Sequence, residues 1–317
     1  MSIFVSVASY CDDLLDSTIE SIFQQADNPN EIFVGVIDQN FQRNIRISMS
    51  KYAHHVRYVH IDFRESRGVC WARNLASTLY QNEDWYFQID AHTLFDKAWD
   101  SYLISLAKSC QHINSKVILS SYPNPFIIEN GQFKKKPIWD RVIVHALDAN
   151  SSFNENSAFL QFRGISIDRH EPIIGGHLAA GNIFARGDLF HEVPYDPFLY
   201  FREEEQSLSV RSFTHGWSIF HYANIPVYHL YSQANAVDKS KTLHWDMTHQ
   251  EQRINNCCVK YNEISKARFN ILMSDSSNLG IYGHGQVRTL TDYAACFGID
   301  YIQRQISPIA YVHNQDR

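Results

Sequence analysis

The chain has 317 residues, of which 44% are hydrophobic and 20% charged, and its formal net charge is −6. This length suits one large α/β domain, or one domain with a substantial appendage. The negative charge argues against a nucleic-acid partner, because such proteins neutralise phosphates with excess lysine and arginine.

The sequence contains no run of about 20 apolar residues that would predict a membrane helix. Its first ten residues have a strand pattern, unlike a signal peptide. We therefore expect a cytoplasmic protein, which can still visit the inner face of a membrane.

The first 120 residues alternate strand and helix patterns. Apolar runs predict strands over residues 3–9, 32–37, 56–61, 85–89 and 117–119, and periodic patterns predict helices over 15–23, 69–80 and 99–107. This order predicts a mainly parallel sheet with helices on both faces. Right-handed crossovers then bring the carboxyl ends of the strands to one edge, where ligands of such sheets bind.

The pattern changes after residue 120, where proline- and glycine-rich loops become frequent. A helix is predicted over residues 203–213, and a strand over 219–230 that Pro226 breaks. The last 80 or so residues are polar and favour helix. We therefore predict a domain over residues 1–235, with a nucleotide-binding half (1–120) and an acceptor half (121–235). Residues 236–317 are predicted to form a helical C-terminal extension.

The tripeptide Asp90-Ala91-His92 follows the predicted strand 85–89 directly. In an extended chain, side chains two residues apart point to the same side, so Asp90 and His92 can face one ion. A carboxylate oxygen and an imidazole nitrogen suit Mn²⁺ or a similar divalent cation such as Mg²⁺. His229, at the end of another predicted strand, offers a third ligand from a distant element. The alternative interpretation makes Asp90 a turn cap and the two histidines ordinary surface or half-buried side chains.

Three consecutive glutamates, Glu203, Glu204 and Glu205, begin the predicted helix 203–213. Acidic residues in a first helical turn are favourable to the helix dipole, which explains some of them. A carboxylate at this point can also hold an acceptor hydroxyl or a donor sugar, or stabilise positive charge at an anomeric carbon. The residues alone leave both interpretations open.

Two further pairs of residues are candidates for ligand contacts. Gly181 allows the backbone to lie close to a sugar, and the amide of Asn182 can contact hydroxyls; the alternative is a tight turn. Arg67 and Arg73 flank the helix before the Asp90 strand, where arginine can neutralise phosphate or fix the metal-binding Asp90. The alternative for the arginines is a solvated helix face.

The chain resembles the N-acetylglucosaminyltransferases that act on hydroxyproline of the Skp1 protein, together with their bacterial relatives. The resemblance spans nearly the whole chain and is carried by residues 5–10, Arg67-Gly68, Ala72-Arg73, 88–92, 180–182, Glu204-Glu205, Ser207, Arg211, 214–217, 227–229, Tyr282-Gly283, 288–290 and 298–300.

The resemblance implies a GT-A fold of Rossmann type, a UDP-GlcNAc donor, a divalent metal and retention of anomeric configuration. Position by position, Asp90 and His92 match the metal motif, and His229 matches the later metal-side histidine. Glu204 and Glu205 match an acidic pair near the acceptor and donor sugar. Ser9 and Tyr10 match the strand end that faces the nucleoside. The sequence departs at Glu203, where the family has a small residue.

We therefore predict a metal-dependent glycosyltransferase that moves a sugar from a UDP-sugar to a hydroxyl on a glycan or a protein, as polysaccharide biosynthesis requires. One alternative is a nucleotidyltransferase that makes sugar nucleotides. Such enzymes carry a glycine-rich phosphate loop after the first strand, whereas residues 9–13 here contain no glycine. A second alternative is a non-catalytic carbohydrate-binding protein on the same fold.

Overall fold

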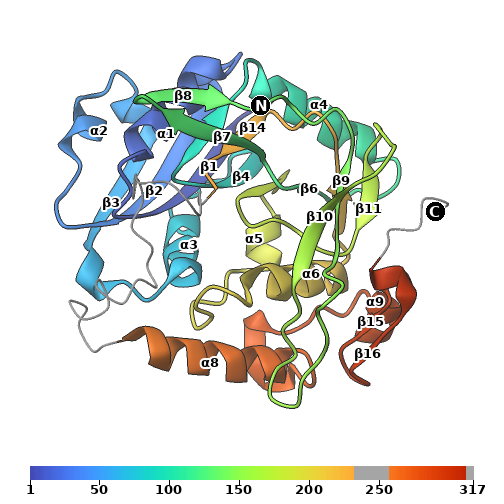
Figure 1. The fold of residues 1–317 in the computed structure, drawn as a ribbon. Coiled ribbons are helices and arrows are strands. Elements are labelled where there is room, and N and C mark those ends of the chain that lie inside the picture. Colours follow the sequence, from blue (N-terminus) through green and yellow to red (C-terminus); the bar gives the residue numbers. More distant parts are fainter. Residues whose placement is uncertain (232–256, 312–317) are drawn as a thin grey trace.

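The computed structural model describes residues 1–231 and 257–311. Its centre is an eight-stranded sheet in the order β11-β13-β6-β12-β4-β1-β2-β3 (Figure 1). The strands of this sheet are β1 (Ile3–Tyr10), β2 (Ile32–Asn40), β3 (Val56–Asp62), β4 (Trp85–Asp90), β6 (Val117–Leu119), β11 (Ile173–Gly175), β12 (Asn182–Arg186) and β13 (Ser218–His221). All five strands predicted in the first 120 residues are present.

The sheet is mainly parallel, as predicted, with two exceptions. Strands β1, β2, β3 and β4 pair in parallel, and so do β6 and β13. Strand β12 is antiparallel to both β4 and β6, and the edge strand β11 is antiparallel to β13. Because β12 runs antiparallel to its neighbour β4, it begins at the edge of the sheet where β4 ends.

Helices cover both faces of the sheet, and the alternation of side chains along β1 shows why. Ile3, Val5 and Val7 belong to one buried cluster, which also contains apolar residues of α1 and α4. Phe4 points to the opposite face and joins a second cluster with residues of α3, α5 and α6. The helices are α1 (Leu15–Gln25), α2 (Ile45–Met49), α3 (Val69–Ser77), α4 (Trp99–Cys110), α5 (Leu189–Glu192), α6 (Glu204–Thr214), α8 (Cys257–Leu272) and α9 (Leu290–Phe297).

Helix α3 is shorter than the predicted span 69–80. After Ser77, the backbone N–H groups of Thr78, Leu79 and Tyr80 each donate to a carbonyl three residues back. Such bonds tighten the last turn into 3₁₀ geometry, and the helix ends there.

A second, four-stranded sheet lies beside the first, in the order β5-β14-β7-β8. Its strands are β5 (Thr93–Phe95), β7 (Asn124–Glu129), β8 (Gln132–Lys135) and β14 (Val227–His229). The predicted strand 219–230 is thus two strands, β13 and β14, that enter different sheets on either side of Pro226. Two small ribbons, β9 (Ile143–Leu147) with β10 (Phe162–Ser166) and β15 (Ile299–Asp300) with β16 (Gln305–Ile306), complete the strands.

The C-terminal helices α8 and α9 pack against the core of the preceding part of the chain. Phe269 and Leu272 of α8 and Tyr293 of α9 belong to the same buried cluster as Leu208 of α6. The predicted boundary between residues 235 and 236 lies outside the described residues. Among the described helices, none is long and apolar enough to cross a membrane.

Candidate active site at the carboxyl edge of the sheet

Strand pairing brings Asp90, His92 and His229 together. Strand β4 ends at Asp90, and after a turn through Ala91 and His92 the chain enters β5. Strand β14 pairs with β5 in antiparallel register, so His229 lies opposite Thr93 and beside His92. The backbone N–H of Leu230 also donates to the carbonyl of His92 at 3.1 Å. The pairing of β14 with β5 therefore brings His229 next to His92, although the two residues are 137 positions apart in the sequence.

The three side chains form a compact set of donor atoms. His92 Nε2 lies 2.9 Å from His229 Nε2, which lies 3.1 Å from an Asp90 carboxylate oxygen. Adjacent ligands of an octahedral ion with bonds of about 2.1 Å are separated by about 3 Å, so these donors fit one divalent cation. Within residues 1–231 and 257–311, no other three acidic, histidine or cysteine side chains are arranged in this way.

A buried arginine links this cluster to the start of α6. The Arg73 guanidinium lies 2.5 Å from Asp90 and forms a second ion pair with Glu204. Burial opposes ionisation of Asp90, but Arg73 and His229 outweigh it and hold the pKa of Asp90 below its usual range. Burial also raises the pKa of Glu204, which Arg73 opposes. Arg73 thus keeps Asp90 in the charged form that a cation requires.

Among the residues that the structure describes, no cation forms an ion pair with Glu205, whereas Glu204 is paired with Arg73. Its carboxylate accepts a hydrogen bond from the Ala180 backbone N–H at 2.8 Å. Burial raises its pKa to about 7, so the group exchanges a proton near neutrality. The adjacent Gly181 packs closely on the cluster of Asp90, His92 and His229, since a Cβ there would lie 2.6 Å from an Asp90 oxygen.

These residues line one cleft of about 700 Å³. Its lining includes the predicted site residues Tyr10, Arg73, Asp90, His92, Gly181, Glu204, Glu205 and His229. Aromatic side chains that sequence reasoning did not single out, Tyr122, Phe159, Phe201 and Tyr231, form further parts of the wall. A large cleft with convergent charged groups is the expected form of a site for a polar ligand.

Three residues predicted as ligand contacts, Ser9, Asn182 and Arg67, are not among the residues that line the cleft. Ser9 is buried in β1, opposite Asp38 of β2. Asn182 is fully buried, and its amide donates to the Ser121 carbonyl and the Tyr222 hydroxyl. Arg67 is exposed, with its guanidinium over the ring of Trp71.

The three consecutive glutamates, Glu203, Glu204 and Glu205, make different contacts. Glu203 accepts a hydrogen bond from the Ser265 hydroxyl at 2.6 Å and thereby connects the start of α6 with α8. Glu203 is not part of the cleft lining, whereas Glu204 and Glu205 are. The pair that matched the resemblance is therefore the pair at the cleft.

Asp12 is a polar neighbour of the candidate metal site, the cluster of Asp90, His92 and His229, that sequence reasoning missed. Its carboxylate lies 2.7 Å from His92 Nδ1. The sequence did contain a signal for this residue. The segment that follows the first strand has no glycine, and it places the acidic residue Asp12 at the edge of the sheet where ligands bind.

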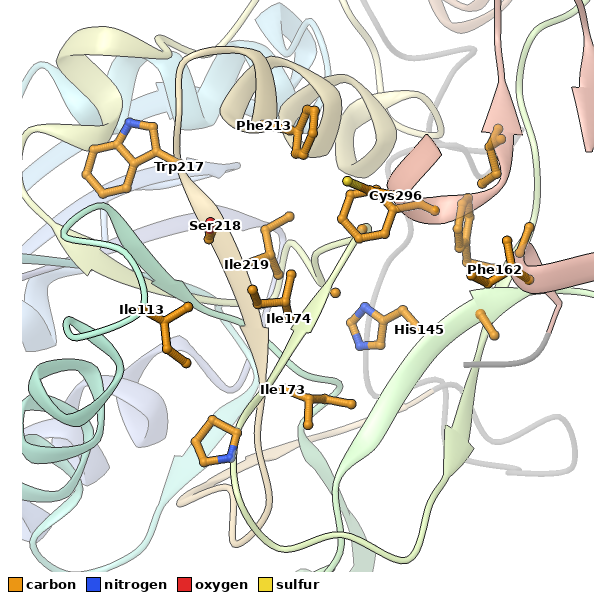
Figure 2. A pocket seen from close by; sticks show the side chains of 18 of the residues that line it. Ile113, His145, Phe162, Ile173, Ile174, Phe213, Trp217, Ser218, Ile219 and Cys296 are labelled. Carbon is orange, nitrogen blue, oxygen red and sulfur yellow. The ribbon is translucent and has the colours of Figure 1, made fainter. Parts of the chain in front are cut away.

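A second cavity, of about 660 Å³, lies at the other end of α6 (Figure 2). Its wall is mainly apolar, with side chains such as Ile113, Ile173, Phe213 and Ile219 directed toward it. The polar residue His145 is engaged by the backbone, because its Nδ1 lies 2.9 Å from the His177 carbonyl oxygen. Burial holds the pKa of His145 well below its ordinary value. The lining also includes the charged residues Arg169, Glu171, Arg288 and Asp292.

The mixed α/β sheet, with Asp90, His92 and His229 at its ligand edge, fits the class of glycosyltransferases of GT-A type. The chain matches the family model described as "Glycosyltransferase (GlcNAc)" over residues 2–53 and 43–303, and it belongs to this family. The family is one of glycosyltransferases, as the sequence predicted.

Comparison with solved structures gives matches at low sequence identity. The crystal structure of GalNAc-T7 with UDP, GalNAc and Mn²⁺ is 14% identical, with a TM-score of 0.57 over 93% of this chain and 54% of that chain. The chain thus spans about half the length of GalNAc-T7. The structure of S. aureus TarS 1–349 is also 14% identical, with a TM-score of 0.43 over 71% of this chain and 60% of that chain. A search of curated proteins finds no match.

Proposed function

We propose that the protein transfers GlcNAc from UDP-GlcNAc to a hydroxyl of a glycan or protein, in a metal-dependent reaction that retains anomeric configuration. The observation that carries the proposal is the convergence of Asp90, His92 and His229 in the lining of the cleft. The family description supports the sugar. The ligands named for GalNAc-T7, a nucleotide, a sugar and Mn²⁺, support the donor class and the cofactor.

In this proposal, the edge of the sheet binds the diphosphate of the donor. Asp90, His92 and His229 would hold a divalent cation, which supplies charge neutralisation for the leaving phosphates without proton transfer. Arg73 keeps Asp90 ionised and adds positive charge next to it. Tyr10, at the end of β1, lines the same cleft and is our candidate for the nucleoside contact.

The sugar and the acceptor would lie between Gly181 and the start of α6. Glu204 is engaged by Arg73, so it is poorly placed to serve as a free base. Glu205, with a pKa of about 7, is the carboxyl that can hydrogen-bond a sugar or acceptor hydroxyl in either protonation state. In a retaining reaction, a leaving phosphate oxygen can take the acceptor proton, and no protein base is obligatory.

A donor-hydrolysis screen tests the proposal. The full chain is incubated with Mn²⁺ and a panel of UDP-sugars, and the released UDP and any pyrophosphate are quantified, with Asp90→Ala as the inactive control. We expect UDP release that is highest with UDP-GlcNAc and lost on chelation. Early NMR spectra of the product formed with an added acceptor would give the anomeric configuration.

Each alternative has its own result in this screen. Release of pyrophosphate would identify a nucleotidyltransferase. Carbohydrate binding with no thermal stabilisation by UDP plus Mn²⁺ would identify a non-catalytic binding protein. Inversion of configuration, together with a loss of 10²-fold or more in Glu205→Gln, would make Glu205 a general base and refute retention.

A further inference from the structure

The carboxylate of Asp12 lies behind one histidine of the metal cluster. Asp12 follows β1, and its side chain is 5% exposed. One carboxylate oxygen accepts a hydrogen bond from the Leu14 backbone N–H at 2.9 Å, and the other lies 2.7 Å from His92 Nδ1. The first contact fixes the orientation of the carboxylate, and the second aims it at the imidazole.

We infer that Asp12 is a positioning residue that orients His92 and fixes its tautomer for metal binding. The inference rests on the proposed metal site. A carboxylate accepts a hydrogen bond from Nδ1–H, and this tautomer leaves the Nε2 lone pair available on the side of His229 and Asp90. Partners of this kind, beyond the direct ligands, set the ring orientation of metal-binding histidines and raise their basicity.

The backbone of the metal turn is held independently of Asp12. The Thr18 hydroxyl donates to the Ala91 carbonyl at 2.7 Å and accepts from the Thr93 N–H at 2.9 Å. Thr18 is buried on α1 and so clamps the turn on both sides of His92. Loss of the Asp12 carboxylate should therefore alter the imidazole of His92 and leave the course of the chain unchanged.

The variant Asp12→Asn keeps a side chain of similar shape at this position but removes the carboxylate. It therefore tests whether the carboxylate itself sets the orientation and tautomer of His92. If the amide oxygen keeps the Leu14 hydrogen bond, the amide NH₂ faces His92 Nδ1 and requires a lone pair there. The ring proton then moves to Nε2, which blocks that nitrogen as a ligand. Asp13→Asn is the matched control, because it removes the same charge from the next residue, whose side chain is exposed.

The experiment is calorimetric titration of the full chain with Mn²⁺ alone, without nucleotide or sugar. We expect Asp12→Asn to bind Mn²⁺ about 10- to 100-fold more weakly than wild type, and Asp13→Asn to remain within about twofold. Circular dichroism and thermal unfolding of the metal-free proteins establish that the variants are folded. If Asp12→Asn does not fold, Asp12→Ser takes its place, since a serine hydroxyl can still accept from the Leu14 N–H.

The outcomes distinguish this inference from the proposed function. Equal Mn²⁺ affinities in Asp12→Asn and Asp13→Asn, with tight binding by wild type, would overturn the role of Asp12 alone. Absence of Mn²⁺ binding by wild type would refute the metal site, and the proposed function with it. A selective loss in Asp12→Asn supports the positioning role whatever the donor sugar proves to be.

Discussion

Gly181 offers a direct test of how tightly the metal cluster is packed. An alanine Cβ at this position would lie 2.6 Å from an Asp90 oxygen, whereas ordinary contacts begin near 3.4 Å. The carboxylate would have to retreat by about 0.4 to 0.8 Å, which exceeds the roughly 0.2 Å that metal–ligand distances tolerate. Its retreat is also limited, because the other Asp90 oxygen is 2.5 Å from Arg73. We expect Gly181→Ala to weaken Mn²⁺ binding by about 10-fold or more.

The assay is Mn²⁺ titration together with urea unfolding of the metal-free protein. Gly131→Ala, in the hairpin between β7 and β8, is the control: a Cβ there meets nothing within 4 Å, but its φ of +73° is left-handed. It should cost about 1 kcal/mol of stability without changing Mn²⁺ affinity. Gly181→Ala should show the opposite pattern, with a large loss of affinity and little loss of stability. Wild-type affinity in Gly181→Ala would refute the close packing on which this reasoning depends.

Three further predictions concern the charges at the cleft. Arg73→Met should destabilise the fold by about 3 to 5 kcal/mol in chemical denaturation, because Glu204 would remain buried and unpaired; the double variant Arg73→Met/Glu204→Leu should recover part of this loss. Because burial raises the folded-state pKa of Glu205 to about 7 from an ordinary 4.5, its contribution to stability is full below about pH 4.5 and is lost as the pH rises through 7. Glu205→Gln should remove this fall from the pH dependence of unfolding, and an unchanged profile would contradict the raised pKa. Mn²⁺ at 100 times its dissociation constant should stabilise wild type by about 2.7 kcal/mol in thermal unfolding, and His229→Ala should abolish this increase.

The sequence was informative wherever buried strands alternate with amphipathic helices. The predicted strand over residues 85–89 extends by only one residue, to Asp90, and the predicted helix 203–213 is shifted by one residue. Because parallel strands end at a common edge, the same pattern indicated where Asp90 would lie. These features depend on local periodicity, which a single sequence records well.

Contacts between distant polar side chains were harder to predict. The Asn182 amide is satisfied by Ser121 and Tyr222, and nothing in the local sequence distinguishes this buried network from a surface site. Asp12 was missed for the same reason, since its partner His92 is 80 residues away. The split of residues 219–230 into β13 and β14 was indicated by Pro226, but their assignment to different sheets depends on tertiary pairing.

The register of the short strand β14 decides whether His229 can act as a ligand. A shift by one residue would turn its side chain to the opposite face of the sheet, away from His92. Three residues of pairing would specify this register weakly, and contacts at both ends of the strand reinforce it. The Asp96 N–H donates to the Pro226 carbonyl at 2.9 Å, and the Tyr228 hydroxyl donates to the Asp96 carboxylate at the same distance. Beyond the strand, the Leu230 N–H donates to the His92 carbonyl. The break in the strand at Pro226 and the pairing of β14 with β5 thus determine the face of the sheet on which the His229 imidazole lies. In this way the second sheet places one side chain of the candidate metal site at the edge of the first sheet.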